Sequence, residues 1–438
     1  MSPSESTATT TPEAIPTTAP RRAWWVIVCL TLLNSIGMTV VFPVLPFVTL
    51  EYVPEGSLAL WVGVLESVNA LCAFLVAPLL GGLSDRVGRR PVLILSAFGA
   101  AASYALFGVG GALWVLVAAR ALQGLAAGDM PAIFAYVADI TPAKDRTKRY
   151  GLLGALTGVG MMIGPAIGGA LSKVSLDAPV YATALVAVLV GVVSVFALPE
   201  SLAPGNRTAK LKLEELHPFK VLKDAFARTE LRVLLVGFTL VSIPFYFYAN
   251  NLSVLGHDSV GWGPSQVGLL LSAAGVLDIV VQGGLLALLL PRIGERGVVV
   301  SGIVAQAVGC GGLAVVALWF GAPQLLAVAA LLFASGQGAM TAALDGLMSN
   351  AVGADEQGWL AGGVSSIGSA IQMTAPLLAG WLYASTGHAT PYALGFAMIV
   401  AAAVLLFRAV GSPARRPAMD QTNEAVQSAM RSTGDLRD

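Results

Sequence analysis

Four ionisable side chains lie deep inside long apolar runs of this sequence: Glu66, Arg120, Asp129 and Asp278. A charged side chain at the centre of a lipid bilayer costs about 2.5–3.5 kcal/mol on insertion scales, and such residues usually serve the movement of protons, ions or substrates. A fifth, Asp345, lies near one end of its run, where water reaches it, which favours a role in gating. The chemistry that these residue types offer is the reversible protonation of buried carboxylates.

Glu66 and Arg120 lie at similar depth, each about eight residues, or roughly 12 Å of helix, from the same side of the membrane. Equal depth predicts that they are partners. Burial favours the protonated carboxyl group and a nearby guanidinium favours the ionised one, so a pair that opens and closes would load and release a proton. The alternative is a permanent ion pair that holds two helices together. Asp129 lies nine residues after Arg120, so on one straight helix the two side chains point to opposite faces. Both can face one central cavity only if the helix bends.

Two further runs carry polar groups that suit a binding site. Asp278 has Gln282 one helical turn on and Gly275 on the same face, which indicates a proton or substrate site or, alternatively, a hydrogen-bonded helix contact. The run near 233–255 contains rings and amides that could hold an amphipathic ligand or form an aromatic belt at the membrane interface. This cluster comprises Phe245, Tyr246, Phe247, Tyr248, Asn250 and Asn251.

The segment GVGMMIGPAIGGAL places Gly160, Gly164 and Gly168 on one helical stripe. Such a stripe lets two helix backbones approach closely. Pro165 removes a helix hydrogen bond and predicts a kink. We interpret the stripe either as a helix contact that moves during function or as static tight packing.

The elements that position these residues must be membrane-spanning helices. Hydrophobic residues make up 56% of the 438 residues and charged residues 11%, against about 25% charged residues in a typical soluble domain. The formal net charge of zero gives no indication of nucleic-acid binding. The three cysteines lie in apolar runs and the three histidines in polar connections, a pattern that favours neither a metal site, nor a disulfide framework, nor a histidine proton relay.

A helix needs about 20 apolar residues to cross a bilayer, and the sequence contains twelve runs of about that length. They fall near residues 24–46, 58–83, 91–110, 113–138, 151–172, 179–198, 233–255, 264–290, 298–320, 324–350, 358–384 and 391–411. If both termini are cytoplasmic, 23 of the 25 Lys and Arg residues lie on the cytoplasmic side, and the exceptions are Arg120 and Lys173. This asymmetry predicts the topology by the positive-inside rule.

A long polar stretch divides the runs into two sets of six. DRVGRRPV at 85–92 and PRIGERGV at 291–298 lie 206 residues apart, each between the second and third run of its half. This spacing indicates an internal duplication, although any two short basic turns look alike. Two such halves around a central site are typical of transporters. We predict a disordered cytoplasmic tail over 1–22, a six-helix bundle over 23–198, a cytoplasmic loop over 199–230, a second six-helix bundle over 231–411 and a cytoplasmic tail over 412–438.

Several motifs resemble those of the major facilitator superfamily, and more narrowly its twelve-span drug–proton antiporters. GGLSDRVGRRP, from Gly81 to Pro91, is similar to the inner-turn signature of the superfamily. Arg120, Gln123 and Gly124 resemble its fourth-span motif. GMMIGPAIGG resembles the fifth-span motif of antiporters, and IGMTVVFPVLP the first-span motif of these exporters. YVADITPAKDRTKRYGLLGA, GWGPSQVGLLLSAAG and the 340–384 stretch also resemble tetracycline-exporter segments.

The resemblance implies an all-α membrane fold of twelve transmembrane helices in two pseudo-symmetric six-helix bundles that work by alternating access. It also implies proton coupling through Arg120 and an inner charge cluster of Asp85, Arg89 and Asp139. We expect the inner gate to comprise Gly81, Asp85, Arg86, Gly88, Arg89, Arg90, Asp139 and Asp345. We expect the proton and substrate site to comprise Glu66, Arg120, Asp129, Asp278, Asn34, Gln123, Tyr246, Asn250 and Gln282.

This sequence departs from the family pattern at two places. Many relatives carry an acidic residue in the first span, where this sequence has Asn34 near mid-depth, so more weight falls on Glu66 and Asp278 as proton sites. In the second half, Pro291 stands where the first half has Asp85, and the inner charge cluster is therefore expected on one side only.

We expect a multi-pass protein of the bacterial inner membrane that is not an enzyme, because the sequence shows no nucleophile–base pair or metal cluster. Its expected function is proton-coupled efflux of amphipathic drugs, tetracycline-like or of several classes, by a monomer that uses the proton gradient and no cofactor. One alternative is the transport of a lipid, sugar or other metabolite by the same fold. Another is a sensor that binds its ligand without moving it.

Overall fold

The computed structural model describes residues 21–410 except 128, 204, 206, 208–228, 320, 354 and 355. This part of the chain forms helices and turns and contains no β-strand. In a helix the backbone N–H and C=O groups bond to one another, and this is required in lipid because lipid offers them no hydrogen-bond partners. The expected tail over 412–438, and most of the segments 1–22 and 199–230, lie outside the described residues, while Arg21 and Arg22 already belong to the first helix.

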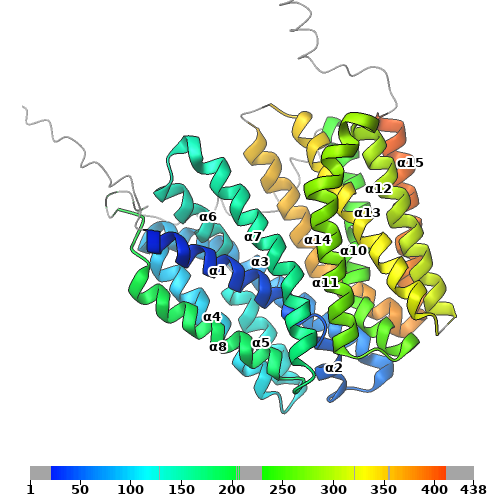
Figure 1. Cartoon of the computed structure of the whole chain (residues 1–438), viewed down its shortest axis with the longest axis horizontal. Coiled ribbons are helices and arrows are strands. Elements are labelled where there is room, and N and C mark those ends of the chain that lie inside the picture. The colour runs from blue at the N-terminus through cyan, green and yellow to red at the C-terminus, as the bar shows by residue number, and fades with distance from the viewer. Residues whose placement is uncertain are drawn as a thin grey trace, which may run out of the picture.

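The first half of the chain forms one bundle, shown from blue to green in Figure 1. Its helices are α1 (Arg21–Val40), α2 (Leu45–Leu50), the short η1 (Glu55–Ser57), α3 (Leu58–Val87), α4 (Arg89–Val109), α5 (Leu113–Ala126), α6 (Asp129–Ile140), α7 (Ala143–Leu171) and α8 (Ala178–Ala197). Within this bundle α1 packs on α7 and α8, and α4 packs on α5 and α8.

The second half forms the other bundle, shown from green to red in Figure 1. It contains α10 (Thr229–Val260), α11 (Pro264–Val280), the π-helical η4 (Val281–Leu285), α12 (Leu286–Leu318), α13 (Pro323–Asn350), α14 (Gln357–Thr386) and α15 (Thr390–Val410). Here α12 packs on α13 and α15, and α10 packs on α14 and α15.

Nine segments of the described residues are long and apolar enough to cross a membrane, against twelve expected runs. Segment 264–318 covers two of those runs, which are separated at Gly294, where the backbone leaves helical geometry with a φ of 67°. The run expected at 113–138 is broken into α5 and α6, and neither piece is among the nine. α14, whose sequence is rich in Gly, Ser and Thr, is also not among them.

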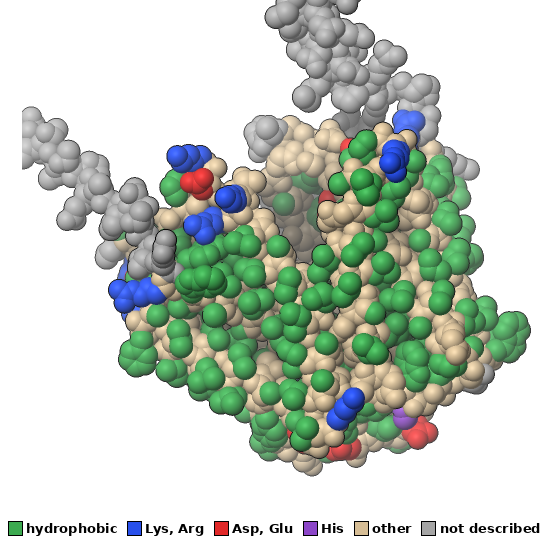
Figure 2. All heavy atoms as spheres, in the orientation of Figure 1, with side chains coloured by type: hydrophobic (Ala, Val, Ile, Leu, Met, Phe, Trp, Pro, Cys, Tyr) green, Lys and Arg blue, Asp and Glu red, His purple; other side chains and the backbone are tan. Residues whose placement is uncertain are grey.

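The two bundles meet along two helix pairs, α3 with α14 and α7 with α11. Figure 2 shows a cleft between the bundles that opens at the end where α6 joins α7. The flanks are covered by apolar side chains (Figure 2), and large residues such as Phe196, Leu269 and Trp319 are exposed there, as expected for surfaces in contact with lipid.

Candidate functional site

Glu66 on α3 and Arg120 on α5 form an ion pair, with 2.5 Å between Glu66 Oε1 and Arg120 Nη2. The partnership predicted from equal depth is therefore confirmed. The side chain of Arg120 is 3% exposed and that of Glu66 is 18% exposed. Glu66 is thus the member of the pair that is more accessible to a proton or a ligand.

A hydrogen-bond network extends the pair to one more helix, α4. Arg120 Nη1 donates to Gln123 Oε1 at 2.6 Å, and Gln123 Nε2 donates to the Tyr104 hydroxyl on α4 at 2.9 Å. Asn69 on α3 donates to the carbonyl of Arg120 at 3.2 Å. A Cβ atom on Gly37 of α1 would lie 2.6 Å from the Tyr104 hydroxyl. The charge of Arg120 is therefore held by groups from α3, α4 and α5, against α1.

The position of Arg120 depends on close packing of α5 against α3. A Cβ atom on Gly124 would lie 2.2 Å from the carbonyl oxygen of Asn69, so a larger residue would push the two helices apart. α5 ends at Ala126 and α6 begins at Asp129. This break interrupts the straight helix that would have turned Arg120 and Asp129 to opposite faces, although the side chain of Asp129 lies outside the described residues.

Two more of the expected cavity residues lie on different bundles. Asn34 is partly buried on α1. Tyr246 on α10 is partly buried and lies within electrostatic reach of Glu66. The second bundle thus brings a phenol ring toward the ion pair of the first bundle.

Asp278 near the end of α11 makes the contact predicted from the sequence. Gln282 Nε2 donates to both carboxylate oxygens of Asp278 at 2.8 Å. Gln282 belongs to η4, the π-helical turn that follows α11, and π-helical turns are frequent at functional sites. On the other side lies α13, where a Cβ atom on Gly338 would be 2.0 Å from Asp278 Oδ1. A side chain at position 338 would displace the carboxylate.

Gly338→Ala is therefore expected to push Asp278 out of place. Overpacking of this kind typically costs about 1–3 kcal/mol, and transport should fall about tenfold or more if Asp278 takes part in it. Gly346→Ala is the matched control, because Gly346 lies on the same helix with no atom within 4 Å of its Cβ position. The test is to measure the transport rate and the melting temperature of both variants. Equal transport by the two would show that Asp278 takes no part in transport.

Asp345 lies near the end of α13 and is exposed. Its exposure agrees with the expectation that water reaches this carboxylate. In this respect Asp345 differs from Asp278, which is partly buried. Any role of Asp345 is therefore at the rim of the site.

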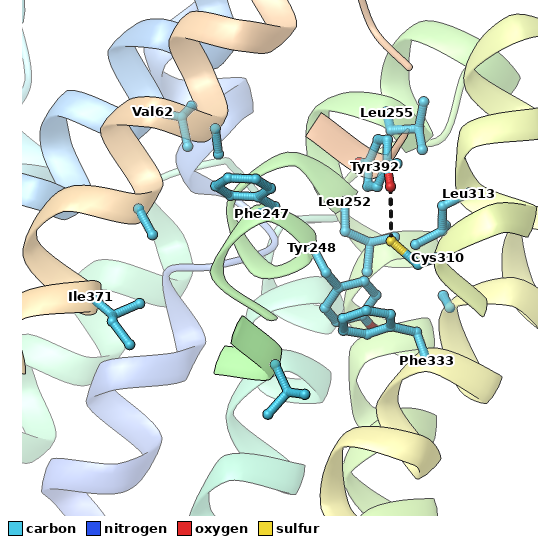
Figure 3. Packing of buried hydrophobic residues seen from close by; sticks show 14 of the residues in the cluster. Val62, Phe247, Tyr248, Leu252, Leu255, Cys310, Leu313, Phe333, Ile371 and Tyr392 are labelled. Atoms are coloured by element: carbon cyan, nitrogen blue, oxygen red, sulfur yellow. Dashed lines mark hydrogen bonds between the residues drawn. The ribbon is translucent and has the colours of Figure 1, made fainter. Parts of the chain in front are cut away.

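The aromatic cluster on α10 does not form a belt against lipid. Phe247 and Tyr248 are 1% and 4% exposed. Figure 3 shows Phe247 among core side chains that include Val62, and Tyr248 against Phe333, with the Tyr248 and Phe333 rings stacked at 4.7 Å. The belt interpretation is wrong for these rings because they point into the protein.

The amides of the same cluster connect helices. Asn251 donates to the carbonyl of Ala379 on α14 at 3.1 Å, and Asn250 donates to the side chain of Asn251 at 2.8 Å. Both are buried. The cavity residues that remain partly accessible in this cluster are Phe245 and Tyr246.

The glycine stripe of α7 packs against α1 of its own bundle. Cβ atoms at Gly160, Gly164 and Gly168 would lie 2.5, 2.0 and 2.3 Å from Ser35, Thr39 and Val40. Because both helices belong to the same bundle, this geometry favours static packing over a contact that moves.

The contact between bundles uses the neighbouring face of α7. A Cβ atom on Gly268 of α11 would lie 2.4 Å from the carbonyl oxygen of Pro165 and 2.9 Å from Gly169. Ser265 of α11 donates to the carbonyl of Gly169 at 2.6 Å. The two helices therefore touch backbone to backbone.

α3 and α14 make an equivalent contact. A Cβ atom on Gly63 would lie 2.3 Å from the carbonyl oxygen of Pro376, and one on Gly380 would lie 2.1 Å from that of Ala59. Pro376 and Gly380 each follow their α7 counterparts, Pro165 and Gly169, by 211 residues. We call these two glycine-lined contacts the bundle seams.

The predicted inner charge cluster is present in the first bundle. Arg89 forms ion pairs with Asp85 and with Asp139, the latter at 3.4 Å between Nε and Oδ2. Asp139 also accepts a hydrogen bond from Ser201 at 2.8 Å. The turn between α3 and α4 requires Gly88, whose φ is 113°.

Glu200 was missed by the sequence reasoning. Its Oε1 accepts backbone hydrogen bonds from Arg89 at 2.9 Å, Ser201 at 3.0 Å and Leu202 at 3.1 Å. The carboxylate thus caps the start of α4. Its contact with α4 is made through Arg89, 111 residues away in the chain, so no local pattern marks this role.

The other inner-gate residues are placed as follows. Arg90 donates to the carbonyl of Val195 at the end of α8, Arg86 is exposed and Gly81 is partly buried. In the second bundle, Pro291 stands in place of the acidic residue, and nearby Asn350 donates a hydrogen bond to the carboxylate of Glu295 at 3.3 Å. The ion-paired cluster of the described residues is one-sided, as expected.

The chain matches the family model described as Major Facilitator Superfamily over residues 27–371 and 257–434. It is 33% identical over 374 residues to the class C tetracycline resistance protein of Escherichia coli, covering 85% of this chain and 92% of that protein. It is also 33% identical to the class E tetracycline resistance protein of Escherichia coli, covering 81% and 86%. The fold resembles the crystal structure of the human organic anion transporter MFSD10, with a TM-score of 0.62, 22% identity, and coverage of 90% and 100%. This chain belongs to the major facilitator superfamily and is a multi-pass membrane transporter.

Proposed function

We propose that the protein exports amphipathic drugs in exchange for protons. The observation that carries the proposal is the ion pair of Glu66 and Arg120, in which a nearly inaccessible guanidinium faces a partly accessible carboxylate. Protonation of Glu66 would remove its charge and weaken the pair, and deprotonation would restore it. Exchange is favourable because one charge moved through 100 mV yields about 2.3 kcal/mol.

Three other features support this assignment. The relatives at 33% identity are named tetracycline resistance proteins. Tyr246 of the opposite bundle lies within electrostatic reach of Glu66, so both bundles contribute polar groups to this region. The cleft in Figure 2 opens at the end that carries the inner charge cluster, which we assign to the cytoplasm. We further propose that the protein lies in the bacterial inner membrane with both termini cytoplasmic.

In this proposal the bundles rock about a central site formed by Glu66, Arg120, Gln123 and Tyr246, with Asp278 and Gln282 as a second carboxylate site. Drug enters through the cytoplasmic cleft while the seams hold the opposite end closed. Protonation on the outer side drives the return stroke. The inner cluster of Arg89, Asp85 and Asp139 holds together the end of the first bundle that must move.

Cells that express the protein should accumulate less tetracycline and less of an unrelated lipophilic cation than cells with an empty vector. A protonophore should remove both differences, because export depends on the gradient. Efflux that continues undiminished after the gradient is collapsed would overturn the proposal. Protection against neither compound would instead favour a metabolite carrier of the same fold.

A further inference from the structure

The start of α7 carries a group of unpaired cations. Lys144, Arg146, Lys148 and Arg149 stand within six residues, with Asp145 as the acidic residue among them. The first three are exposed, and none of the four forms a salt bridge in the described part of the chain. Figure 2 shows such blue side chains gathered over the α6–α7 end of the molecule. This end is therefore strongly positive.

Arg149 is held in place by an aromatic ring from another helix. Its guanidinium carbon lies 4.1 Å from the ring centroid of Trp24 at the start of α1, a cation–π contact. A cation–π contact uses none of the N–H groups of the guanidinium as hydrogen-bond donors to the ring's substituents, and a guanidinium can bind phosphate through two parallel N–H donors. The described residues accept no hydrogen bond from this side chain. Its donors are available to an anion.

The neighbouring surface is apolar. Trp25, next to the stacked ring, is 64% exposed, and Leu152, about one turn along α7 from Lys148, is 44% exposed. Exposed indole rings of membrane proteins lie at the level of the lipid headgroups. An occupant of this surface must be acidic at one end and apolar at the other.

We propose that the adjoining starts of α1 and α7 bind an anionic phospholipid. Lys148 and Arg149 contact the phosphate, and the acyl chains lie along Trp25 and Leu152. Charge complementarity selects an acidic headgroup, and the apolar border excludes a free anion or a nucleic acid as the natural occupant. Because Trp24 and Arg149 belong to different helices, the bound lipid bridges the first and fifth spans of one bundle.

The test uses full-length protein in detergent, with lipid retention followed by native mass spectrometry. Wild type should retain phosphatidylglycerol in preference to phosphatidylcholine. Lys148→Gln with Arg149→Gln should weaken phosphatidylglycerol binding about 30-fold, as expected for the loss of two interfacial cations. The matched control is Arg292→Gln with Arg296→Gln, which removes two exposed cations from the turn in the second bundle and should leave binding unchanged.

Three outcomes would overturn the proposal: equal retention of both lipids, equal loss in both double variants, or displacement of the lipid by millimolar inorganic phosphate, which would indicate a free-anion site. If the double variant does not fold, Lys148→Gln alone serves, because Lys148 is exposed. It should weaken binding about fivefold, and unchanged binding would contradict the assignment.

Discussion

Glu66→Gln is expected to abolish pH-gradient-driven transport while leaving the protein folded and able to bind substrate. Glutamine keeps the shape of glutamate and can still accept a hydrogen bond from Arg120, but it does not titrate. Leaving the guanidinium without its counter-charge should cost about 1–3 kcal/mol, less than the cost of about 3–5 kcal/mol for complete removal of one partner of a buried pair. Uptake driven by an imposed pH gradient should fall to background in sealed vesicles.

Substrate exchange at equal pH separates coupling from binding. The Gln variant should still exchange labelled for unlabelled substrate, because that process needs no net proton movement. Glu51→Gln is the control, since Glu51 is exposed and forms no salt bridge in the described part of the chain. Gradient-driven uptake by Glu66→Gln at the wild-type rate would show that the ion pair only holds two helices together.

Gly380→Ala is expected to shift the protein toward the state in which the seam between α3 and α14 is open. The added methyl group would lie 2.1 Å from the carbonyl oxygen of Ala59 and 2.9 Å from the Cα atom of Leu60. Backbone atoms cannot rotate away as a side chain can, so the helices must separate by about 1 Å. The overpacking cost of about 1–3 kcal/mol corresponds to a shift of the conformational equilibrium of about 5-fold to 150-fold.

The shift is measured as the distance between spin labels placed at Gly56 and Ser385, which stand exposed at the closed end of the two bundles, with the three cysteines replaced. Longer distances and slower transport are expected for Gly380→Ala. Gly362→Ala is the matched control, because it adds the same methyl group to the same helix where no atom lies within 4 Å. Unchanged distances in Gly380→Ala would mean that the seam tolerates the methyl group in the closed state.

Much of the fold follows from periodic apolar runs and the distribution of charge. Every expected run is largely helical in the structure, because a helix is the form in which a single apolar segment satisfies its backbone in lipid. The break between α5 and α6 was not predicted as a boundary. It falls between Ala126 and Asp129, shortly before Pro131. Proline is tolerated in the first turn of a helix and disrupts a helix interior, so this residue is the sequence signal that could have marked the boundary.

The candidate site was predictable where depth or helical spacing determines the contact. Equal depth predicted the pair of Glu66 and Arg120, and a separation of four residues predicted the contact of Asp278 with Gln282. Contacts of Asn69, Tyr104 and Glu200 were missed because their partners lie 51, 19 and 111 residues away. Rotation of each helix about its axis, which depends on packing against its neighbours, decides such contacts.

The same limit explains the glycine stripe of α7. Its spacing indicated a close helix contact but not the identity of the neighbour. Packing assigns the stripe to α1 and the adjacent face to α11. A sequence pattern shows that one face of a helix carries only glycines and can be packed closely. Which helix packs against that face depends on the arrangement of the whole bundle.

The measurement that most directly tests proton exchange is the internal pH of sealed vesicles that contain the purified protein and a pH-sensitive dye. A tetracycline gradient imposed at equal internal and external pH should drive protons in the opposite direction, and the dye signal should be absent with Glu66→Gln. Tetracycline movement without any change of internal pH in the wild type would contradict the account.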